Sequence, residues 1–261
     1  MLTIAQTRKH TVPNCYHCIR KIEKRKEYLT MKICGLQKTT LLDFPGHVAA
    51  TIFTGGCNFR CPFCHNSGLL PSWTPKVYSD EEILDFLKKR RGILEGVCIS
   101  GGEPSLQPDL EDFIRQVRSL GLLVKLDTNG CRPDLLKDLC RKGLLDYVAM
   151  DIKAGREHYP QVSGTPGLNM TLIDESIRFL ITGSIPFQFR TTAVKGLHTK
   201  EDFHQIGPWI EGCPHYFIQN FTDNGEVLFP ETFQAFHKEE LEEFAEIMRP
   251  FVGKAALRGV D

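Results

Sequence analysis

Three cysteines in one short loop are the residues of this 261-residue chain with the clearest chemical meaning. Cys57, Cys61 and Cys64 are spaced four and then three residues apart. Such a loop can wrap around an iron–sulfur cube and supply thiolates to three of its irons, which leaves the fourth iron open to a substrate or cosubstrate. A structural zinc site is the alternative, but it normally needs four protein ligands, and no fourth follows at short spacing. The loop alone leaves both possibilities open, and the motifs that follow favour the cluster.

A second motif is the turn Ser100-Gly101-Gly102-Glu103-Pro104. Gly101 and Gly102 permit a close approach of the backbone to a ligand, and the carboxylate of Glu103 suits an ammonium group. An ordinary turn between a strand and a helix has a similar composition. This motif alone therefore does not decide between a ligand site and a plain turn.

Charged residues also lie on, or directly after, three later predicted strands. Asp127-Thr128-Asn129-Gly130 and Met150-Asp151-Ile152-Lys153 each place an acidic residue at a strand end. Two carboxylates at adjacent strand ends form a candidate cation or substrate site. Arg190, on the next strand, is a candidate for binding a carboxylate through two parallel hydrogen bonds.

The segments that carry these motifs alternate between predicted strands and helices. Short apolar and β-branched runs predict six strands, at residues 48–54, 97–100, 122–126, 147–151, 187–192 and 216–219. Helical spacing predicts the helices between them, the first of which is capped by Ser79 and Glu82. Parallel strands with right-handed crossovers place their C-terminal ends at one edge, where barrel enzymes carry their catalytic groups. We therefore expect an α/β fold, namely a partial (β/α)6 TIM-like barrel with a parallel sheet, an N-terminal extension and a C-terminal helix packed on the core.

Length and charge indicate one domain with an extension. A chain of 261 residues suffices for a single α/β domain but not for two full ones. Residues 1–30 hold seven basic and two acidic residues, a net charge of +5, and few apolar residues. We expect this segment to be disordered or loosely docked, and the functional domain to span residues 31–261. Within the segment, Cys15 and Cys18 form half of a zinc ribbon and lack completing ligands.

Composition gives no sign of nucleic-acid or membrane binding. Lys+Arg and Asp+Glu both total 32, so we expect neither nucleic acid nor a membrane as a partner. No apolar run approaches the roughly 20 residues of a membrane span and no signal peptide is present, which predicts a cytoplasmic protein. In a reducing cytosol, four further cysteines are expected to be packed thiols and not ligands of a second cluster. These are Cys98, Cys131, Cys140 and Cys213.

Together, the cysteine loop and the Gly-Gly-Glu-Pro turn resemble the radical S-adenosylmethionine (SAM) superfamily, whose members share both motifs. The resemblance implies that Cys57, Cys61 and Cys64 are the metal ligands of a [4Fe–4S] cluster and that SAM binds its open iron. It also implies that Gly101-Gly102-Glu103 meets the ammonium group of SAM and that the backbone around Phe63 meets its adenine. Reductive cleavage of SAM would give methionine and a 5′-deoxyadenosyl radical, a chemistry that the protein supports by position, electrostatics and exclusion of water.

A narrower resemblance is to the activating enzymes of glycyl-radical enzymes, such as the pyruvate formate-lyase activating enzyme. It rests on Asp127-Thr128 and Met150-Asp151-x-Lys153, which in that family surround a monovalent cation beside the SAM carboxylate. Lys153 and Arg190 are then catalytic candidates that face the methionine end or the incoming peptide, and residues 159–164 lie where the substrate backbone enters. The implied partners are a glycyl-radical enzyme and a low-potential electron donor such as flavodoxin or ferredoxin.

Narrower still, residues 35–46 and the ending Leu257-Arg258-Gly259 are similar to the anaerobic ribonucleoside-triphosphate reductase activating proteins. Residues 217–221 lack the Tyr-His ending expected of a pyruvate formate-lyase activase, which favours the reductase as the partner. Pyruvate formate-lyase activases stay open as an alternative, as do radical SAM enzymes that act on small molecules, such as the 7-carboxy-7-deazaguanine synthases. A non-catalytic metal-binding module is disfavoured because distinctive motifs follow four strands.

Overall fold

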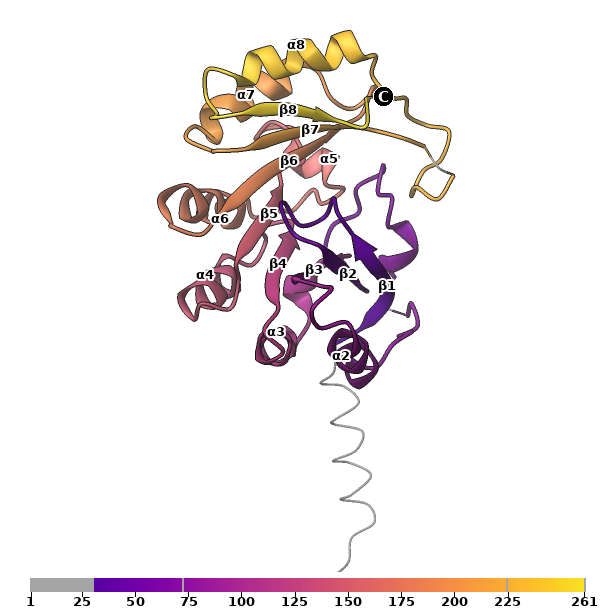
Figure 1. The fold of residues 1–261 in the computed structure, drawn as a ribbon. Helices are drawn as coiled ribbons and strands as arrows, with labels where there is room; N and C mark the ends of the chain where they lie inside the picture. The colour runs from indigo at the N-terminus through magenta and orange to yellow at the C-terminus, as the bar shows by residue number, and fades with distance from the viewer. Residues whose placement is uncertain (1–30, 72, 224, 261) are drawn as a thin grey trace, which may run out of the picture.

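The computed structural model describes residues 31–260 apart from residues 72 and 224, and its centre is one eight-stranded sheet whose strand order follows the chain (Figure 1). The first strand, β1 (Ile33–Thr40), is antiparallel to β2 (Ala49–Thr54), and each later strand is parallel to the one before it. The later strands are β3 (Gly96–Gly101), β4 (Leu123–Thr128), β5 (Tyr147–Asp151), β6 (Phe187–Ala193), β7 (Tyr216–Asn220) and β8 (Ala255–Arg258). β1 and β8 lie at the two ends of this order, so the sheet curls without closing. The expectation of an open, barrel-like α/β fold is confirmed.

The six predicted strands are present as β2 to β7, but the sequence pattern does not predict the two edge strands, β1 and β8. β1 contains Gly35 and exposes residues 37–39, so it lacks the alternation that marks a half-buried strand. β8 has only four residues, and its Ala-Ala-Leu-Arg sequence favours a helix over a strand. Both edges form because the neighbouring strand offers unpaired backbone groups, which a short sequence pattern does not reveal.

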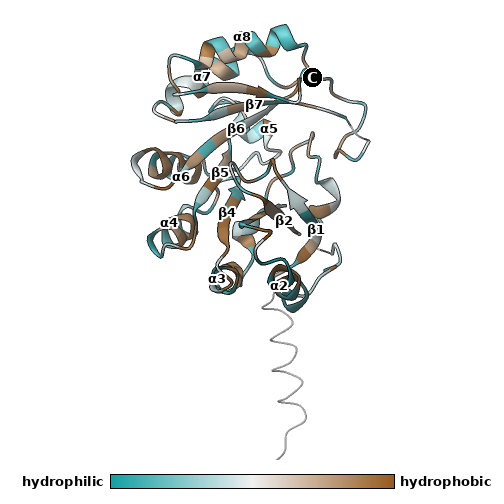
Figure 2. Cartoon of the chain, viewed as in Figure 1, coloured by the Kyte–Doolittle hydropathy of each residue, from teal (hydrophilic) through white to brown (hydrophobic). Residues whose placement is uncertain are grey.

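Helices join the parallel strands, and Figure 1 shows α3, α4 and α6 side by side on the outer face of the sheet. The helices are α2 (Asp80–Lys89), α3 (Leu110–Ser119), α4 (Pro133–Arg141), α5 (Tyr159–Val162), α6 (Met170–Thr182), α7 (Lys200–Trp209) and α8 (Lys238–Met248). The predicted capping box of α2 is confirmed, because the Glu82 backbone N–H donates to Ser79 Oγ at 3.1 Å and the Ser79 N–H donates to the Glu82 carboxylate at 2.7 Å. α8 carries hydrophilic and hydrophobic residues (Figure 2), and its buried residues lie at helical spacing, as expected of a helix packed on the core.

The two faces of the sheet differ in chemistry. Successive side chains of a strand point to opposite faces. In β4, Val124 and Leu126 belong to the hydrophobic core, whereas Lys125 and Asp127 alternate with them and point to the inner face. The same alternation on β6 places Arg190 on the inner face. Polar and charged side chains therefore line the inside of the curved sheet.

Residues 1–30 lie outside the residues that the structure describes, and so do the predictions made for Cys15, Cys18 and the basic extension. In the described part of the chain, no helix is long and apolar enough to cross a membrane. The cysteines of this part are free thiols, and the four expected to be packed are buried or half-buried. Cys98, Cys131, Cys140 and Cys213 thus have the burial predicted for them.

Candidate active site

The cysteine loop begins where β2 ends and lines a cavity of about 230 Å³. The same cavity is lined by side chains from the C-terminal ends of β3 to β7. Its position is that of the active sites in parallel barrels, because the loops that follow parallel strands gather at one edge. The cavity therefore brings together motifs that lie far apart in the sequence.

Burial keeps the three thiols of the loop neutral in the metal-free protein. Desolvation raises the pKa of Cys57 to about 12, although the backbone N–H of Phe59 donates to its Sγ at 3.3 Å and opposes the shift. Desolvation likewise raises the pKa of Cys61 to about 11, and the nearby charge of Lys153 opposes it. A metal centre must displace these protons, and Lys153 favours the resulting thiolates.

The donor set fits an iron–sulfur cluster better than a single metal ion. Between residues 31 and 260, the described Cys, His, Asp and Glu side chains form no group of three that could hold one metal ion. A [4Fe–4S] cube needs no such convergence, because each thiolate ligates a different iron. Three thiols around one cavity thus fit a cube with one open iron and do not fit structural zinc.

The short helix α5 and the residues after it hold the back of the cysteine loop. The Arg60 N–H donates to the carbonyl oxygen of Ser163 at 2.9 Å, and Cys61 Sγ lies 3.7 Å from the same oxygen. Gly164 has a φ of +63°, and a Cβ there would lie 2.1 Å from the carbonyl oxygen of Arg60. Only glycine permits this approach. Residues 159–164 are expected at the substrate entrance from the sequence, which does not reveal this contact with the cluster loop.

Gly101 and Gly102 bring the end of β3 against the end of β2. A Cβ on Gly101, whose φ is +112°, would lie 2.4 Å from the Thr54 nitrogen, and a Cβ on Gly102 would lie 2.1 Å from the Gly56 oxygen. The Gly102 N–H donates to the Thr54 oxygen at 2.8 Å. The close approach that these glycines permit is therefore to the neighbouring strand, and it fixes the turn at the edge of the cavity.

Glu103 is a buried carboxylate that joins the ends of β3 and β4. It is 1% exposed and accepts hydrogen bonds from the Ser105 N–H at 3.0 Å, Thr128 Oγ1 at 2.8 Å and the Asn129 N–H at 2.6 Å. Burial raises its pKa, and these hydrogen bonds oppose the shift. Both carboxylate oxygens thus have protein donors before any ligand binds.

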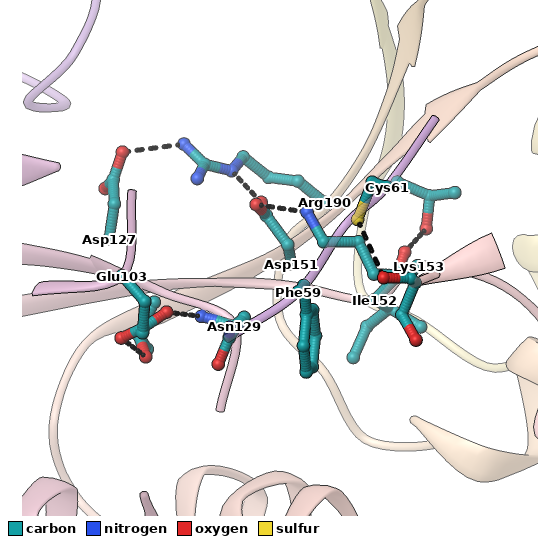
Figure 3. A network of polar contacts seen from close by, with 12 residues as sticks. Phe59, Cys61, Glu103, Asp127, Asn129, Asp151, Ile152, Lys153 and Arg190 are labelled. Atoms are coloured by element: carbon teal, nitrogen blue, oxygen red, sulfur yellow. Dashed lines mark hydrogen bonds and ion pairs between the residues drawn. The ribbon is translucent and has the colours of Figure 1, made fainter. Parts of the chain in front are cut away.

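A row of alternating charges crosses the inner ends of β4, β5 and β6. Arg190 lies between two carboxylates, with Nη1 3.1 Å from Asp127 Oδ2 and Nε 2.8 Å from Asp151 Oδ1 (Figure 3). Lys153 Nζ lies 2.9 Å from Asp151 Oδ2, and Lys125 is paired with Asp127. Burial alone would raise the pKa values of Asp127 and Asp151, but the neighbouring cations, Arg190 foremost, lower both, so the carboxylates stay ionised.

The comparison with protein families agrees with this geometry. A model described as the radical SAM superfamily matches residues 51–205, which is more than half of the chain. This chain belongs to the radical SAM superfamily. Membership implies a [4Fe–4S] cluster and SAM, and Cys57, Cys61 and Cys64 are the residues that would hold the cluster.

Two curated proteins and a solved structure are similar to more than half of this chain. It is 28% identical over 243 residues to a Methanocaldococcus jannaschii protein provisionally named as a glycyl-radical enzyme activating enzyme, a match that covers 88% of this chain and 96% of that protein. It is 31% identical over 158 residues to a Thermococcus kodakarensis protein provisionally named as a GTP 3′,8-cyclase, which covers 59% of this chain and 50% of that protein. The structure of TYW1 with a lysine-pyruvate adduct bound superposes with a TM-score of 0.61 at 18% identity, over 92% of this chain and 90% of that one, and so shares the fold.

All but one of the predicted radical SAM site residues line the cavity. Those that do are Cys57, Cys61, Phe63, Cys64, Gly101, Gly102, Glu103, Asp127, Thr128, Asp151, Lys153 and Arg190. The exception is Met150, which is fully buried in the core on the outer face of β5. Because Asp151 points inward, the preceding side chain points outward. Only the backbone of Met150 is therefore in a position to take part in the site.

Lys125 is a functional candidate that is not predicted from the sequence, and Ser100 is predicted only as the first residue of the Gly-Gly-Glu-Pro turn. Lys125 is 1% exposed and paired with Asp127, and Ser100 Oγ donates to Asp127 Oδ2 at 3.0 Å. The alternation of β4 contains the signal for Lys125, since a lysine two residues before Asp127 must share its face. This position is easily overlooked, because the residues around Lys125 have the composition of an apolar strand.

Proposed function

We propose that this radical SAM protein activates a glycyl-radical enzyme, and that its partner is the anaerobic ribonucleoside-triphosphate reductase. The observation that carries the proposal is one cavity lined by three cluster-ligand thiols together with Asp127, Thr128, Asp151 and Lys153. A relative provisionally named as such an activating enzyme, matched over 96% of its length, supports it.

The two ends of the SAM methionine group meet opposite charges in this proposal. Lys153 and Arg190 bind the carboxylate, because the row of three cations and two carboxylates to which they belong has one positive charge in excess. The turn Gly101-Gly102-Glu103 meets the ammonium group, and the buried charge of Glu103 complements it. The backbone around Phe63, which lines the cavity, meets the adenine.

The reaction requires one electron and one hydrogen atom. When bound, the cluster supplies the electron, taken from a low-potential donor such as flavodoxin or ferredoxin, that breaks the bond between the sulfonium and the 5′ carbon of SAM. The 5′ carbon then takes the hydrogen atom of a glycine Cα, which yields methionine, 5′-deoxyadenosine and a glycyl radical on the partner. The cavity must hold that glycine about 3 to 3.5 Å from the 5′ carbon. A glycine loop suits this task because it has no side chain to keep it out of the cavity.

The choice of the reductase rests on segments at the two edges of the sheet. Residues 35–46 include most of β1, and Leu257-Arg258-Gly259 ends β8. The Arg258 guanidinium lies 3.6 Å from the ring centre of Phe217 on the neighbouring β7. The segments that resemble the reductase activating proteins are thus structural parts of the two edges, and residues 37–39 of β1 are exposed there.

Electron paramagnetic resonance tests the proposal directly. The reduced protein is incubated with SAM and the anaerobic reductase without oxygen, and we expect a glycyl doublet on the reductase together with nucleotide reduction. The same mixture with the Cys61→Ala variant serves as the control and should give neither signal. A doublet on pyruvate formate-lyase but none on the reductase would transfer the assignment to the pyruvate formate-lyase activases.

The similarity to a GTP 3′,8-cyclase provides an alternative of a different class, in which the substrate is a small molecule. The chain spans half of the length of that relative, which makes the alternative weaker than the activase. Incubation of the reduced protein with SAM and GTP separates the two. Consumption of GTP without a glycyl doublet on any candidate partner would favour the small-molecule enzyme.

A further inference from the structure

The segments Asp127-Thr128 and Met150-Asp151-x-Lys153 are the place where the resemblance to glycyl-radical activases implies a monovalent cation. Such a cation takes oxygen ligands, and these two carboxylates are the negative charges available to it on β4 and β5. Whether the site fits a cation depends on what the carboxylate oxygens already contact.

All four carboxylate oxygens have a cationic nitrogen as a partner. Asp127 Oδ1 is paired with Lys125 Nζ, and Asp127 Oδ2 lies 3.1 Å from Arg190 Nη1. Asp151 Oδ1 lies 2.8 Å from Arg190 Nε, and Asp151 Oδ2 lies 2.9 Å from Lys153 Nζ. Arg190 therefore bridges the two carboxylates, as Figure 3 shows, in the position expected of a metal cation.

The charge balance also disfavours an added ion. Lys125, Arg190 and Lys153 already outnumber the two carboxylates by one charge. The side chain of Lys125 is 1% exposed and that of Arg190 is 15% exposed, so solvent screens this excess only weakly. A further cation would raise the excess to two in a largely buried site, whereas the carboxylate of SAM would neutralise it.

Lys125 is held in place from a second side. Its Nζ lies 3.5 Å from Cys98 Sγ, and Cys98 is the residue opposite it on β3. The lysine is thus part of the folded inner face and not a mobile side chain that closes on Asp127 by chance. Its charge stays beside Asp127 whether or not Arg190 turns toward a ligand.

We propose that the guanidinium of Arg190, supported by the buried ammonium of Lys125, replaces the monovalent cation in this protein, so that SAM binding requires neither sodium nor potassium. The inference rests on the SAM site of the proposed function. It concerns residues of this chain alone and does not depend on the identity of the glycyl-radical partner.

Calorimetric titration with SAM tests the inference on the anaerobically reconstituted wild-type protein. The buffers contain potassium, sodium or tetramethylammonium as the sole monovalent cation, since tetramethylammonium is too large for a carboxylate pocket. We expect dissociation constants that agree within about twofold. Binding that is about tenfold or more tighter in potassium than in tetramethylammonium would overturn the inference. A failure to bind SAM in every buffer would overturn the proposed function as well, so the two failures are distinguishable.

The variant Lys125→Met sharpens the test, because methionine has similar length and no charge. We expect it to bind SAM about tenfold more weakly in tetramethylammonium and to regain affinity in potassium, which can then enter beside Asp127. The matched control is Lys88→Met on the exposed end of α2, which should bind SAM as the wild type does in all three buffers. A folded Lys125→Met protein that matches the wild type in every buffer would contradict the role of Lys125. The wild-type comparison needs no variant and remains decisive if Lys125→Met does not fold.

Discussion

The two sides of the cavity are built by different means. On the side of β2 and β3, backbone hydrogen bonds and glycines hold the cysteine loop and the turn at Glu103 at distances that leave no room for a Cβ. On the side of β4 to β6, the contacts are ion pairs between long side chains, with Arg190 shared by two carboxylates. Burial keeps the three thiols of the first side neutral in the metal-free protein, whereas the second side carries a dense row of charges.

This difference suggests a division of roles. Backbone contacts without free space tolerate almost no change, because a shift in one of them moves the loop. The ion pairs on the second side are made by side chains alone. We therefore expect substitutions on the first side to remove the cluster or the fold around it. Substitutions on the second side should leave the cluster in place and change the binding of SAM.

The largest effect is expected for Cys61→Ala. The loop then has two thiolates, which do not retain a cube, so the protein should lose essentially all of its iron and its brown colour. Iron analysis and visible absorption measure this against about four irons per chain in the wild type. Cys140→Ala, a half-buried thiol on α4, is the matched control and should keep its iron. A Cys61→Ala protein with full iron and absorption would show that the cluster assignment is wrong.

A smaller but substantial effect is expected for Gly164→Ala, which tests the backbone contacts behind the loop. The added Cβ would lie 2.1 Å from the Arg60 oxygen, so the cysteine loop must move. We expect a loss of about 3 kcal/mol in the free energy of unfolding and a reduced iron content. Gly167→Ala, three residues later, is the control, because a Cβ there meets no atom within 4 Å. If the two variants have the same free energy of unfolding and the same iron content, the first side is not rigid.

On the second side, the variant Arg190→Lys keeps the positive charge but removes the guanidinium that joins Asp127 to Asp151. A lysine ammonium does not present two parallel donors to Asp127 and Asp151, so we expect SAM to bind about tenfold more weakly. The iron content should equal that of the wild type. Arg115→Lys, in an exposed pair with Glu111 on α3, is the control for the chemical change. Loss of the cluster in Arg190→Lys would contradict the division between the two sides.

How much of the fold and of the candidate site can be predicted from the sequence depends on whether the residues involved lie close together in the chain. The cysteine loop and the strand-end motifs are short patterns, and the six central strands are short runs rich in apolar and β-branched residues, so both are predictable. The contacts of the loop are not, since Ser163 lies 102 residues from Cys61, and Arg190 lies 63 residues from Asp127. Lys125 is different, because it lies only two residues before Asp127 and the alternation of β4 puts both side chains on one face. A single charge inside an otherwise apolar run does not by itself indicate a functional residue.

The two sides should also respond to pH in opposite directions, with a smaller effect on stability. The neighbouring cations hold the pKa of Asp151 below its unfolded value of about 3.9, so its ion pairs stabilise the fold above that pH, and this stabilisation is lost as the pH falls through the folded pKa. Burial holds the pKa of Glu103 above its unfolded value, so stability is greatest below about pH 4.3 and is lost as the pH rises through the folded pKa.

Variants that lack one of these carboxylates should differ from the wild type in how strongly their stability depends on pH. Thermal unfolding of the cluster-free protein is measured between pH 3 and pH 7, so that the ligand thiols contribute equally to every sample. Relative to the wild type, Asp151→Asn should lose less stability on acidification, and Glu103→Gln should lose more. If both variants change the pH dependence of stability in the same direction, the pKa values of Asp151 and Glu103 are not shifted in opposite directions, and the inferred electrostatic difference between the two sides is wrong.

The smallest effect is expected for deletion of residues 1–30, which lie outside the described structure. The described residues that line the cavity begin at Cys57, and the eight strands of the described sheet lie between Ile33 and Arg258. The deleted segment has a net charge of +5 and contributes Cys15 and Cys18, a pair without the two further ligands that structural zinc needs. Iron content, SAM affinity and SAM cleavage should therefore equal those of the full chain. Zinc bound stoichiometrically to the full chain and lost on deletion would contradict this, because it would require the pair to find ligands in the remaining domain and to be part of its fold.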